Sequence, residues 1–243
     1  MSVMPAFSPL QPNHREKYQD RPRGDVIGLL DFPFQRVLEI GCGCGATGAA
    51  IKQRYPGVYY CGIELDRDAA QDARHVLDHV ATGDIEQMDP ECYGIRKHSF
   101  DVVICADVLE HLYDPWKVVA NFHEYLVSGG RVIASIPNVQ NIRLIHNLLM
   151  GAWTYTGQGF LDATHIRFFT ILEIGQMFVR NGYTVEKVLS VFDANIPAGG
   201  DFPRDIDLGK VVIKQATPDD LQKLYAFQYI IRVRRNEIGG GMA

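Results

Sequence analysis

The sequence predicts an α/β fold, a Rossmann-like sheet of seven mostly parallel strands flanked by helices, with a cap on the substrate side. Short apolar runs alternate with longer stretches of helical pattern, which is typical of parallel strands joined by crossover helices. The first run, residues 37–40, passes directly into a glycine-rich turn over residues 41–48. The 243 residues, 47% of them hydrophobic, suffice for one such domain with an elaboration.

Local signals set the helix boundaries. Pro56-Gly57 ends the first helix, and Asp114-Pro115 begins a later one that Gly129-Gly130 ends. Thr217 is the expected N-cap of the last helix. In chain order we expect strand 37–40, helix 46–54, strand 59–64, helix 67–77, a strand running into residue 83, strand 100–106, a short helical turn at 107–112, a helix from 115 to about 126, strand 131–136, strand 183–192, helix 218–224 and strand 227–234.

Three stretches fall outside these elements. We expect residues 1–30 to form an N-terminal cap segment, and residues 31–238 to form the main domain with insertions at about 138–170 and 193–216. Residues 239–243 are expected to be a flexible tail. Because ligands of open α/β sheets bind beyond the carboxyl ends of the strands, the extra stretches should select the substrate.

An acid inside the first strand narrows the choice of ligand. Glu39 would repel a pyrophosphate but attract an ammonium group, which S-adenosylmethionine has and NAD lacks. Glu64 ends the second strand, where a carboxylate can accept ribose hydroxyls. Asp84 follows the third strand and suits an adenine amino group, with Ile85 against the ring. The glycines alone also fit a dinucleotide fingerprint, so the acids and the glycines together favour the methyl donor.

These motifs resemble the class I S-adenosylmethionine-dependent methyltransferases over roughly residues 15–190. The resemblance rests on residues 38–45, 62–66, 83–85, 100–103, 109–115 and 129–132, and residues 161–170 look like a segment of bacterial small-molecule methyltransferases. It implies the strand order 3-2-1-4-5-7-6 with the last strand antiparallel, and S-adenosyl-L-methionine as cofactor. The expected cofactor-binding residues are Tyr18, Glu39, Gly41, Cys42, Gly43, Gly45, Glu64, Leu65, Asp84, Ile85, Ala106 and Asp107.

The N-terminal segment offers two interpretations. Residues 18–23 could fold over the cofactor, with Tyr18 against its methionine portion and an arginine toward its carboxylate, or they could merely cap the sheet. The aromatic and glycine-rich span 153–160 could likewise be a mobile lid, a pocket wall or the contact of a homodimer.

His165 is the first candidate for a general base. A histidine can take a hydroxyl proton near neutral pH, and Asp162, three residues earlier, could fix its tautomer. The alternative is structural, because the Thr-His step could enter a helix whose apolar residues Ile166, Phe168 and Phe169 pack inward.

His111 is the rival candidate. Asp107, Glu110 and His111 fall at i, i+3 and i+4 on a helix start, a spacing that could hold a hard divalent ion. The pattern is similar to the Glu-x-x-Glu-His metal site of quinone O-methyltransferases and small-RNA terminal methyltransferases, with Asp107 where those have glutamate. The alternative is helix-start scaffolding, and we assign no metal ligand.

Composition excludes several classes of function. The net charge of −5 gives no basic footprint for general nucleic-acid binding, and the cluster at residues 232–235 suits a solvated edge strand. The five cysteines form no zinc pattern, and no run of apolar residues reaches the length of a membrane span. These features favour a cytoplasmic enzyme with a small-molecule substrate.

The leading hypothesis is S-adenosylmethionine-dependent methyl transfer to a hydroxyl of a sugar or natural-product intermediate. N- or C-methylation stays open. The alternatives are an NAD-dependent oxidoreductase or epimerase, which would use the same glycine turn together with a catalytic pair of the Tyr-x-x-x-Lys kind, and a non-catalytic protein that binds the cofactor.

Overall fold

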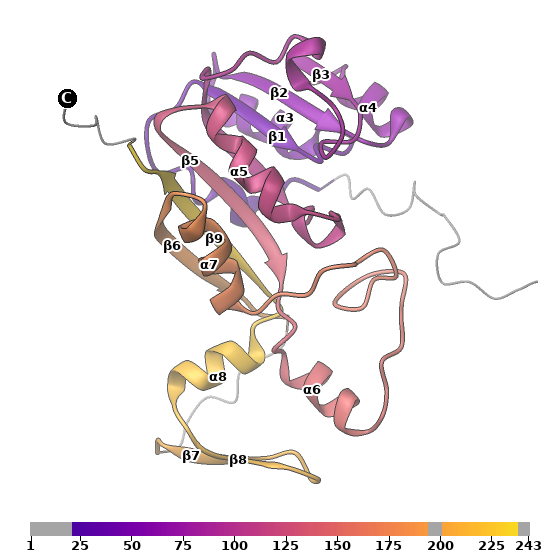
Figure 1. The fold of residues 1–243 in the computed structure, drawn as a ribbon, viewed down its shortest axis with the longest axis vertical. Helices are drawn as coiled ribbons and strands as arrows, with labels where there is room; N and C mark the ends of the chain where they lie inside the picture. Colours follow the sequence, from indigo (N-terminus) through magenta and orange to yellow (C-terminus); the bar gives the residue numbers. More distant parts are fainter. Residues whose placement is uncertain (1–20, 194–200, 238–243) are drawn as a thin grey trace, which may run out of the picture.

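The structure, a computed structural model, describes residues 21–193 and 201–237. Seven strands form the central sheet: β1 (Arg36–Ile40), β2 (Tyr59–Glu64), β3 (His79–Thr82), β4 (Phe100–Ala106), β5 (Leu126–Pro137), β6 (Tyr183–Val191) and β9 (Gln228–Arg235). Their order is β3-β2-β1-β4-β5-β9-β6, and β9 is antiparallel to both of its neighbours (Figure 1). The predicted order with an antiparallel last strand is therefore confirmed.

Helices cover both faces of this sheet. The described helices are α2 (Gly24–Ile27), α3 (Ala46–Arg54), α4 (Arg67–Ala73), α5 (Pro115–Tyr125), α6 (Ile142–Leu149), α7 (Ile171–Arg180) and α8 (Pro218–Tyr225), with single turns of 3-10 helix at η1 (Pro90–Tyr93) and η2 (Leu109–His111). Apolar side chains of α5 and α7 join the core on one face, and those of α2, α3 and α4 join the core on the other. None of the described helices is long and apolar enough to cross a membrane.

The two buried faces explain why the inner strands are apolar almost without interruption. Leu38 and Ile40 of β1 belong to one core, whereas Val37 belongs to the other. A strand covered on both sides loses the alternation of polar and apolar residues that marks a half-exposed strand. The carboxyl ends of β1, β2, β3 and β4 then meet along one edge of the sheet.

Several predicted boundaries were wrong. The helix from residue 67 ends at Ala73 rather than residue 77, because residues 74–76 form turns. Gly129-Gly130 does not end a helix: α5 passes directly into β5 at Leu126, and the glycines lie within that strand. Pairing of Leu126 with Phe100 on β4 outweighs the local stop signal.

The sequence suggested that the arginine cluster at residues 232–235 lies on an edge strand. In the structure it does not. It belongs to β9, between β5 and β6. The guanidinium groups of Arg232 and Arg234 pair with Glu186 of β6 at 3.0 and 3.4 Å, and Arg235 is buried. The run therefore stabilises pairing inside the sheet.

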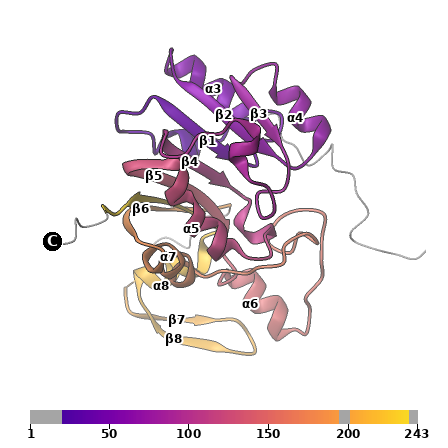
Figure 2. The same ribbon diagram turned by 45° about the horizontal axis from the view of Figure 1, so that its top comes forward.

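A smaller group of elements lies beyond the carboxyl end of β5 (Figures 1 and 2). It contains α6, α8 and the hairpin of β7 (Arg204–Asp207) and β8 (Val212–Ala216). The sequence predicted α8 but neither α6 nor the hairpin. Asn138 ties it to the sheet, because its fully buried side-chain amide donates to the carbonyls of Lys223 and Ala226 at 2.7 and 2.9 Å.

Candidate functional site

The glycine-rich turn lies between β1 and α3. Gly41, Gly43 and Gly45 adopt φ angles of 72°, 53° and 85°, which L side chains rarely adopt. A Cβ atom at Gly41 would also lie 2.5 Å from the Cγ2 atom of Val108. The turn thus needs glycine for its backbone geometry and for its close approach to the end of β4.

Glu64, at the end of β2, closes this turn. Its buried carboxylate accepts hydrogen bonds from the amide of Gly43 at 2.9 Å and the amide of Asp66 at 2.8 Å. Leu65, next to it, is 69% exposed, so a large apolar side chain lies open beside the acid. After β3, the carboxylate of Asp84 accepts a hydrogen bond from the amide of Glu86 at 2.9 Å.

Glu39 is buried beneath the turn. Its carboxylate accepts a 2.8 Å hydrogen bond from the hydroxyl of Tyr60 on β2. Burial raises the pKa of Glu39 to about 7. Cys42 is also buried, with its Sγ atom 2.4 Å from where a Cβ atom at Gly62 would lie, and burial raises the pKa of its thiol. The Cys42 side chain is therefore a packing group.

A polar cluster joins the N-terminal segment to the ends of β4 and β5. Asp107 follows β4 with a φ of 55°, and its carboxylate accepts a 2.5 Å hydrogen bond from the hydroxyl of Ser135. The guanidinium of Arg23 pairs with Asp107 and, at 3.0 Å, with Asp25. The backbone amide of Arg23 donates to the Thr47 hydroxyl at 3.2 Å. An arginine of the N-terminal segment thus lies beside the glycine turn.

A second cluster lies just past Asp107. One ligand-type atom from each of Glu110, His111 and His165 lies within 4.8 Å of the other two. The two imidazole rings make an edge contact, with centroids 4.7 Å apart. The Nδ1 atom of His111 lies 3.1 Å from the carbonyl of Thr164, and that of His165 lies 3.1 Å from the carbonyl of Phe160.

Glu110 is the most buried member of this cluster, with an exposure of 1%. Neither of its carboxylate oxygens has a hydrogen-bond partner among the residues that the structure describes. Burial, and then the nearby charge of Asp107, raise the pKa of Glu110 well above its usual value. Burial, and then the neighbouring His165, lower the pKa of His111.

The segment that carries His165 differs from the structural alternative considered for that residue. It does not enter a helix, because α7 begins only at Ile171. Ile166 and Phe168 are 46% and 38% exposed, so only Phe169 packs inward as predicted. The Phe160 carbonyl takes the place beside His165 Nδ1 that we expected for the Asp162 carboxylate.

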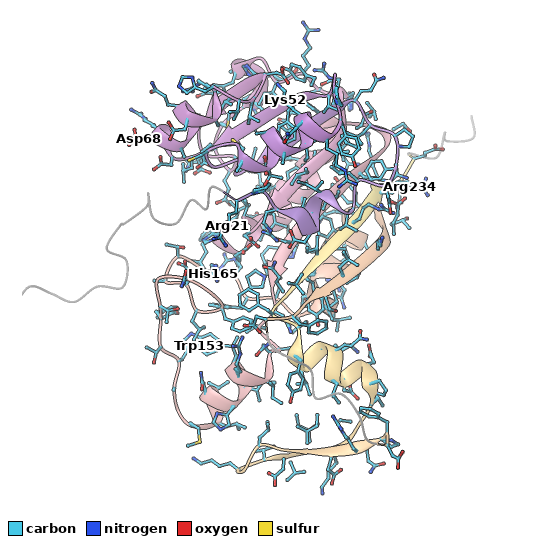
Figure 3. All side chains as sticks on the ribbon, turned by 180° about the vertical axis from the view of Figure 1, so that it is seen from behind. Arg21, Lys52, Asp68, Trp153, His165 and Arg234 are labelled. Atoms are coloured by element: carbon cyan, nitrogen blue, oxygen red, sulfur yellow. The ribbon has the colours of Figure 1, made fainter. Side chains whose placement is uncertain are left out.

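Asp162 instead shapes the segment itself. Its carboxylate accepts hydrogen bonds from the amide and the hydroxyl of Thr164, at 2.8 and 2.7 Å. Figure 3 shows the labelled His165 at the junction between the sheet and the α6 region, with Trp153 nearer α6. Segments far apart in the sequence therefore meet where the glycine turn, β4 and the insertion come together.

Comparison with known proteins identifies this arrangement. A family model described as a methyltransferase domain matches residues 38–132, which run from the glycine turn to β5. A solved S-adenosylmethionine-dependent methyltransferase from Thermotoga maritima superposes with a TM-score of 0.57 over 87% of each chain, at 18% identity. Residues 38–132 match a methyltransferase domain, and the fold is that of a class I S-adenosylmethionine-dependent methyltransferase.

Curated relatives agree with this assignment. The methyltransferase domain is similar to a ubiquinone biosynthesis O-methyltransferase of Neisseria meningitidis, at 28% identity over 50% of this chain and 52% of the relative. A protein of the same name from Aeromonas salmonicida is 27% identical over 73% of this chain and 75% of its own length. The chain thus spans about half the length of the first relative and three quarters of the second.

The donor side of the methyltransferase domain fits S-adenosylmethionine, the cofactor of this family. The turn presents bare backbone at Gly41, Gly43 and Gly45, and Glu39, Glu64 and Asp107 supply acids around it. Ala106 ends β4 beside them, and Ile85 packs against the core. The individual cofactor contacts stay predictions, and Tyr18 lies outside the described residues.

Sequence reasoning missed two features of the methyltransferase domain. Thr47 and Ser135, which hold Arg23 and Asp107, carry no motif of their own. The contact of His111 with His165 was also missed, although both residues were candidates. His111 follows β4 and His165 lies in the insertion, so 53 residues of chain separate them.

Proposed function

We propose that this protein transfers the methyl group of S-adenosylmethionine to a hydroxyl of a small molecule. The observation that carries the proposal is the placement of His111 and His165 at the end of β4, next to Asp107 and the cofactor turn. The Nδ1 atom of each imidazole is within hydrogen-bond distance of a backbone carbonyl, which leaves each Nε2 atom available to accept a hydroxyl proton. The O-methyltransferase name of the curated relatives supports an oxygen acceptor.

The wall beside His165 suggests the kind of acceptor. A small hollow there is lined by Pro137, Val139, Leu144, Phe160, His165, Arg167 and Phe168. Apolar and aromatic side chains dominate this lining, and such a wall suits a planar apolar ring better than a polyhydroxylated sugar. We therefore favour a phenolic or similar ring hydroxyl over the sugar hydroxyl that the sequence also allowed.

When bound, S-adenosylmethionine supplies an electrophilic methyl group on its sulfonium. The protein's task is to hold the acceptor oxygen in line with that methyl in a pocket that excludes water. Phe160 and Phe168 would exclude water, while the Nε2 atom of His165 is the proposed proton acceptor as the oxygen–carbon bond forms. Asp162 acts indirectly, because it shapes the turn through Thr164.

Isothermal titration with S-adenosylmethionine, its demethylated product and NAD tests the donor half of this proposal. We expect the first two to bind and NAD not to bind, with binding lost or strongly weakened in Glu64→Ala because the acid at the end of β2 is gone. Asp68→Ala, on the exposed start of α4, is the matched control. Binding of NAD alone would overturn the proposal.

A panel of phenols, sugars and amines tests the acceptor half, with transfer of labelled methyl as the readout. We expect transfer to phenols and a loss of at least about 100-fold in His165→Ala, the size of a general-base contribution. Transfer only to amines, or cofactor binding with no transfer to any acceptor, would contradict the proposal.

A further inference from the structure

We propose that Glu110, His111 and His165 together hold a divalent cation, and that Asp107 is not one of its ligands. The set differs from the one that the sequence spacing suggested, which comprised Asp107, Glu110 and His111. Its third member comes from the insertion rather than from the turn after β4. The use of the cation in catalysis rests on the proposed methyl transfer, whereas the site itself rests on geometry alone.

The carboxylate of Glu110 is the first argument. It is 1% exposed, and neither oxygen has a hydrogen-bond partner among the described residues. A buried polar group without a partner costs free energy, and protein structures nearly always satisfy such groups. A cation bound between this carboxylate and the two imidazoles would give both carboxylate oxygens an electrostatic partner.

The imidazoles are the second argument. The Nδ1 atom of each ring lies 3.1 Å from a backbone carbonyl, Thr164 for His111 and Phe160 for His165. Because a carbonyl only accepts, these contacts assign the proton to Nδ1 and leave a lone pair on each Nε2. A ring nitrogen held by a backbone carbonyl on one side and free on the other is the usual arrangement of a metal-binding histidine.

The backbone fixes these side chains relative to one another. The carbonyl of Glu110 accepts hydrogen bonds from the amides of Ile166 and Arg167, at 2.9 and 3.0 Å. The insertion segment therefore docks directly on the η2 turn, and the contact of His111 with the Thr164 carbonyl adds a third link. Donors that come from distant parts of the chain are thus held together by structure outside their own side chains.

The distances between the three ligand-type atoms suit a site that contracts slightly when an ion binds. The ligand-type atoms lie within 4.8 Å of one another. With metal–ligand bonds of about 2.0–2.2 Å, the ligands of one ion lie about 3–4 Å apart, so they need to approach by roughly an ångström. Three protein ligands leave open positions, at which an acceptor hydroxyl could bind and lose its proton more readily. With the ion bound, the Nε2 lone pair of His165 is used for the metal, so the ion rather than the imidazole would then activate the acceptor hydroxyl.

Asp107 faces elsewhere. Its carboxylate accepts a hydrogen bond from Ser135 and pairs with the guanidinium of Arg23, so both of its oxygens are engaged. Its positive φ of 55° turns the chain between β4 and η2. The helical i, i+3 spacing that would have aligned Asp107 with Glu110 therefore does not exist in the structure, where η2 begins only at Leu109.

The donor set also indicates the kind of ion. Two imidazoles and one carboxylate suit Zn²⁺, Fe²⁺, Co²⁺ or Mn²⁺, whereas Mg²⁺ prefers oxygen ligands. We expect Co²⁺ and Zn²⁺ to bind more tightly than Mg²⁺.

Titration of the untagged, chelator-treated full chain with Co²⁺ tests the site through the visible absorption of the bound ion. We expect one Co²⁺ per chain, displaced by Zn²⁺ but not by equal Mg²⁺. Glu110→Gln keeps the shape of the side chain and should weaken binding by at least about 100-fold, as should His165→Asn. Asp107→Asn and His146→Asn, the latter on the exposed face of α6, should bind Co²⁺ like the original protein. Circular dichroism and the melting temperature report whether each variant is folded.

Three results would overturn the proposal: no Co²⁺ bound with a Kd below about 1 mM, unchanged binding in a folded Glu110→Gln variant, or a loss in Asp107→Asn equal to that in Glu110→Gln. If both ligand variants fail to fold, Zn²⁺ is added to the Co²⁺-loaded original protein. Loss of the Co²⁺ absorption bands without a shift of the His111 and His165 NMR signals would show that the ion is bound elsewhere, and would also overturn the proposal. Calorimetry with S-adenosylmethionine is run on the same samples. If Co²⁺ binds but S-adenosylmethionine does not, only the proposed methyl transfer is contradicted. If S-adenosylmethionine binds but Co²⁺ does not, only the metal site is contradicted.

Discussion

The hydroxyl of Tyr60 donates a 2.8 Å hydrogen bond to the carboxylate of Glu39, and both side chains are buried between β1, β2 and the helices on that face. Burial is the main cause that raises the pKa of Glu39 to about 7, and the charge of Glu64 adds to it, while the bond from Tyr60 and the charge of Arg23 oppose it. An acid at the base of the cofactor turn is therefore poised to change its charge near neutral pH.

Glu39→Gln should stabilise the protein at alkaline pH. Because the folded-state pKa is about 7 and the ordinary value is 4.5, the folded protein holds the proton more tightly, and its stability falls as pH rises from about 4.5 to 7. The neutral amide removes this cost, which is on the order of 3 kcal/mol above pH 7. Urea denaturation at pH 5 and pH 8 measures it, with Glu173→Gln on α7 as the exposed control. An equal effect at both pH values would contradict this prediction.

Binding of S-adenosylmethionine should release a proton near pH 6.5. An ammonium group near Glu39 favours the ionised carboxylate, so the bound state holds the proton less tightly than the free protein. Calorimetry in two buffers of different ionisation enthalpy measures the release, which should disappear in Glu39→Gln. 5′-Methylthioadenosine, which lacks the ammonium group, is the control ligand. Equal proton release with both ligands would show that another group titrates.

The sequence predicted the first half of the sheet closely, for a physical reason. The bounds of α3, β2 and β4 agree with the predicted ranges residue for residue. Parallel strands buried on both faces are short apolar runs, and their ends are set by glycine, proline or charge within one or two residues. Thr217 likewise caps α8 through a local capping box.

The parts that depend on distant contacts could not be predicted. The hairpin of β7 and β8 has a mostly exposed, polar sequence with no clear alternation, so its pairing left no periodic signal. The contact between His111 and His165 depends on the docking of two irregular segments through backbone hydrogen bonds. Backbone contacts of this kind place little constraint on which residues occur there, and the sequence therefore does not record them.

Gly41→Ala should destabilise the domain more than Gly57→Ala does. Both residues have positive φ angles, 72° and 90°, but only a Cβ atom at Gly41 would clash, at 2.5 Å from Val108 Cγ2. The clash should add about 1–3 kcal/mol to the backbone strain that both variants share. Thermal denaturation measures the difference. The double variant Gly41→Ala with Val108→Ala should recover part of it, and no recovery would show that the clash is not the cause.

Arg23→Ala should weaken binding of S-adenosylmethionine but not of 5′-methylthioadenosine. The Arg23 guanidinium lies at the end of β4, paired with Asp107 and Asp25 and bound through its own amide to Thr47 at the start of α3. From there it is the described arginine best placed to neutralise the cofactor's carboxylate, which 5′-methylthioadenosine lacks. Loss of a charge-assisted hydrogen bond is expected to cost roughly 10- to 100-fold in affinity. Calorimetry with both ligands measures this, and Arg21→Ala, two residues earlier and exposed, is the control. If Arg23→Ala weakened both ligands equally, the arginine would serve to fold the N-terminal segment over the turn rather than to recognise the carboxylate.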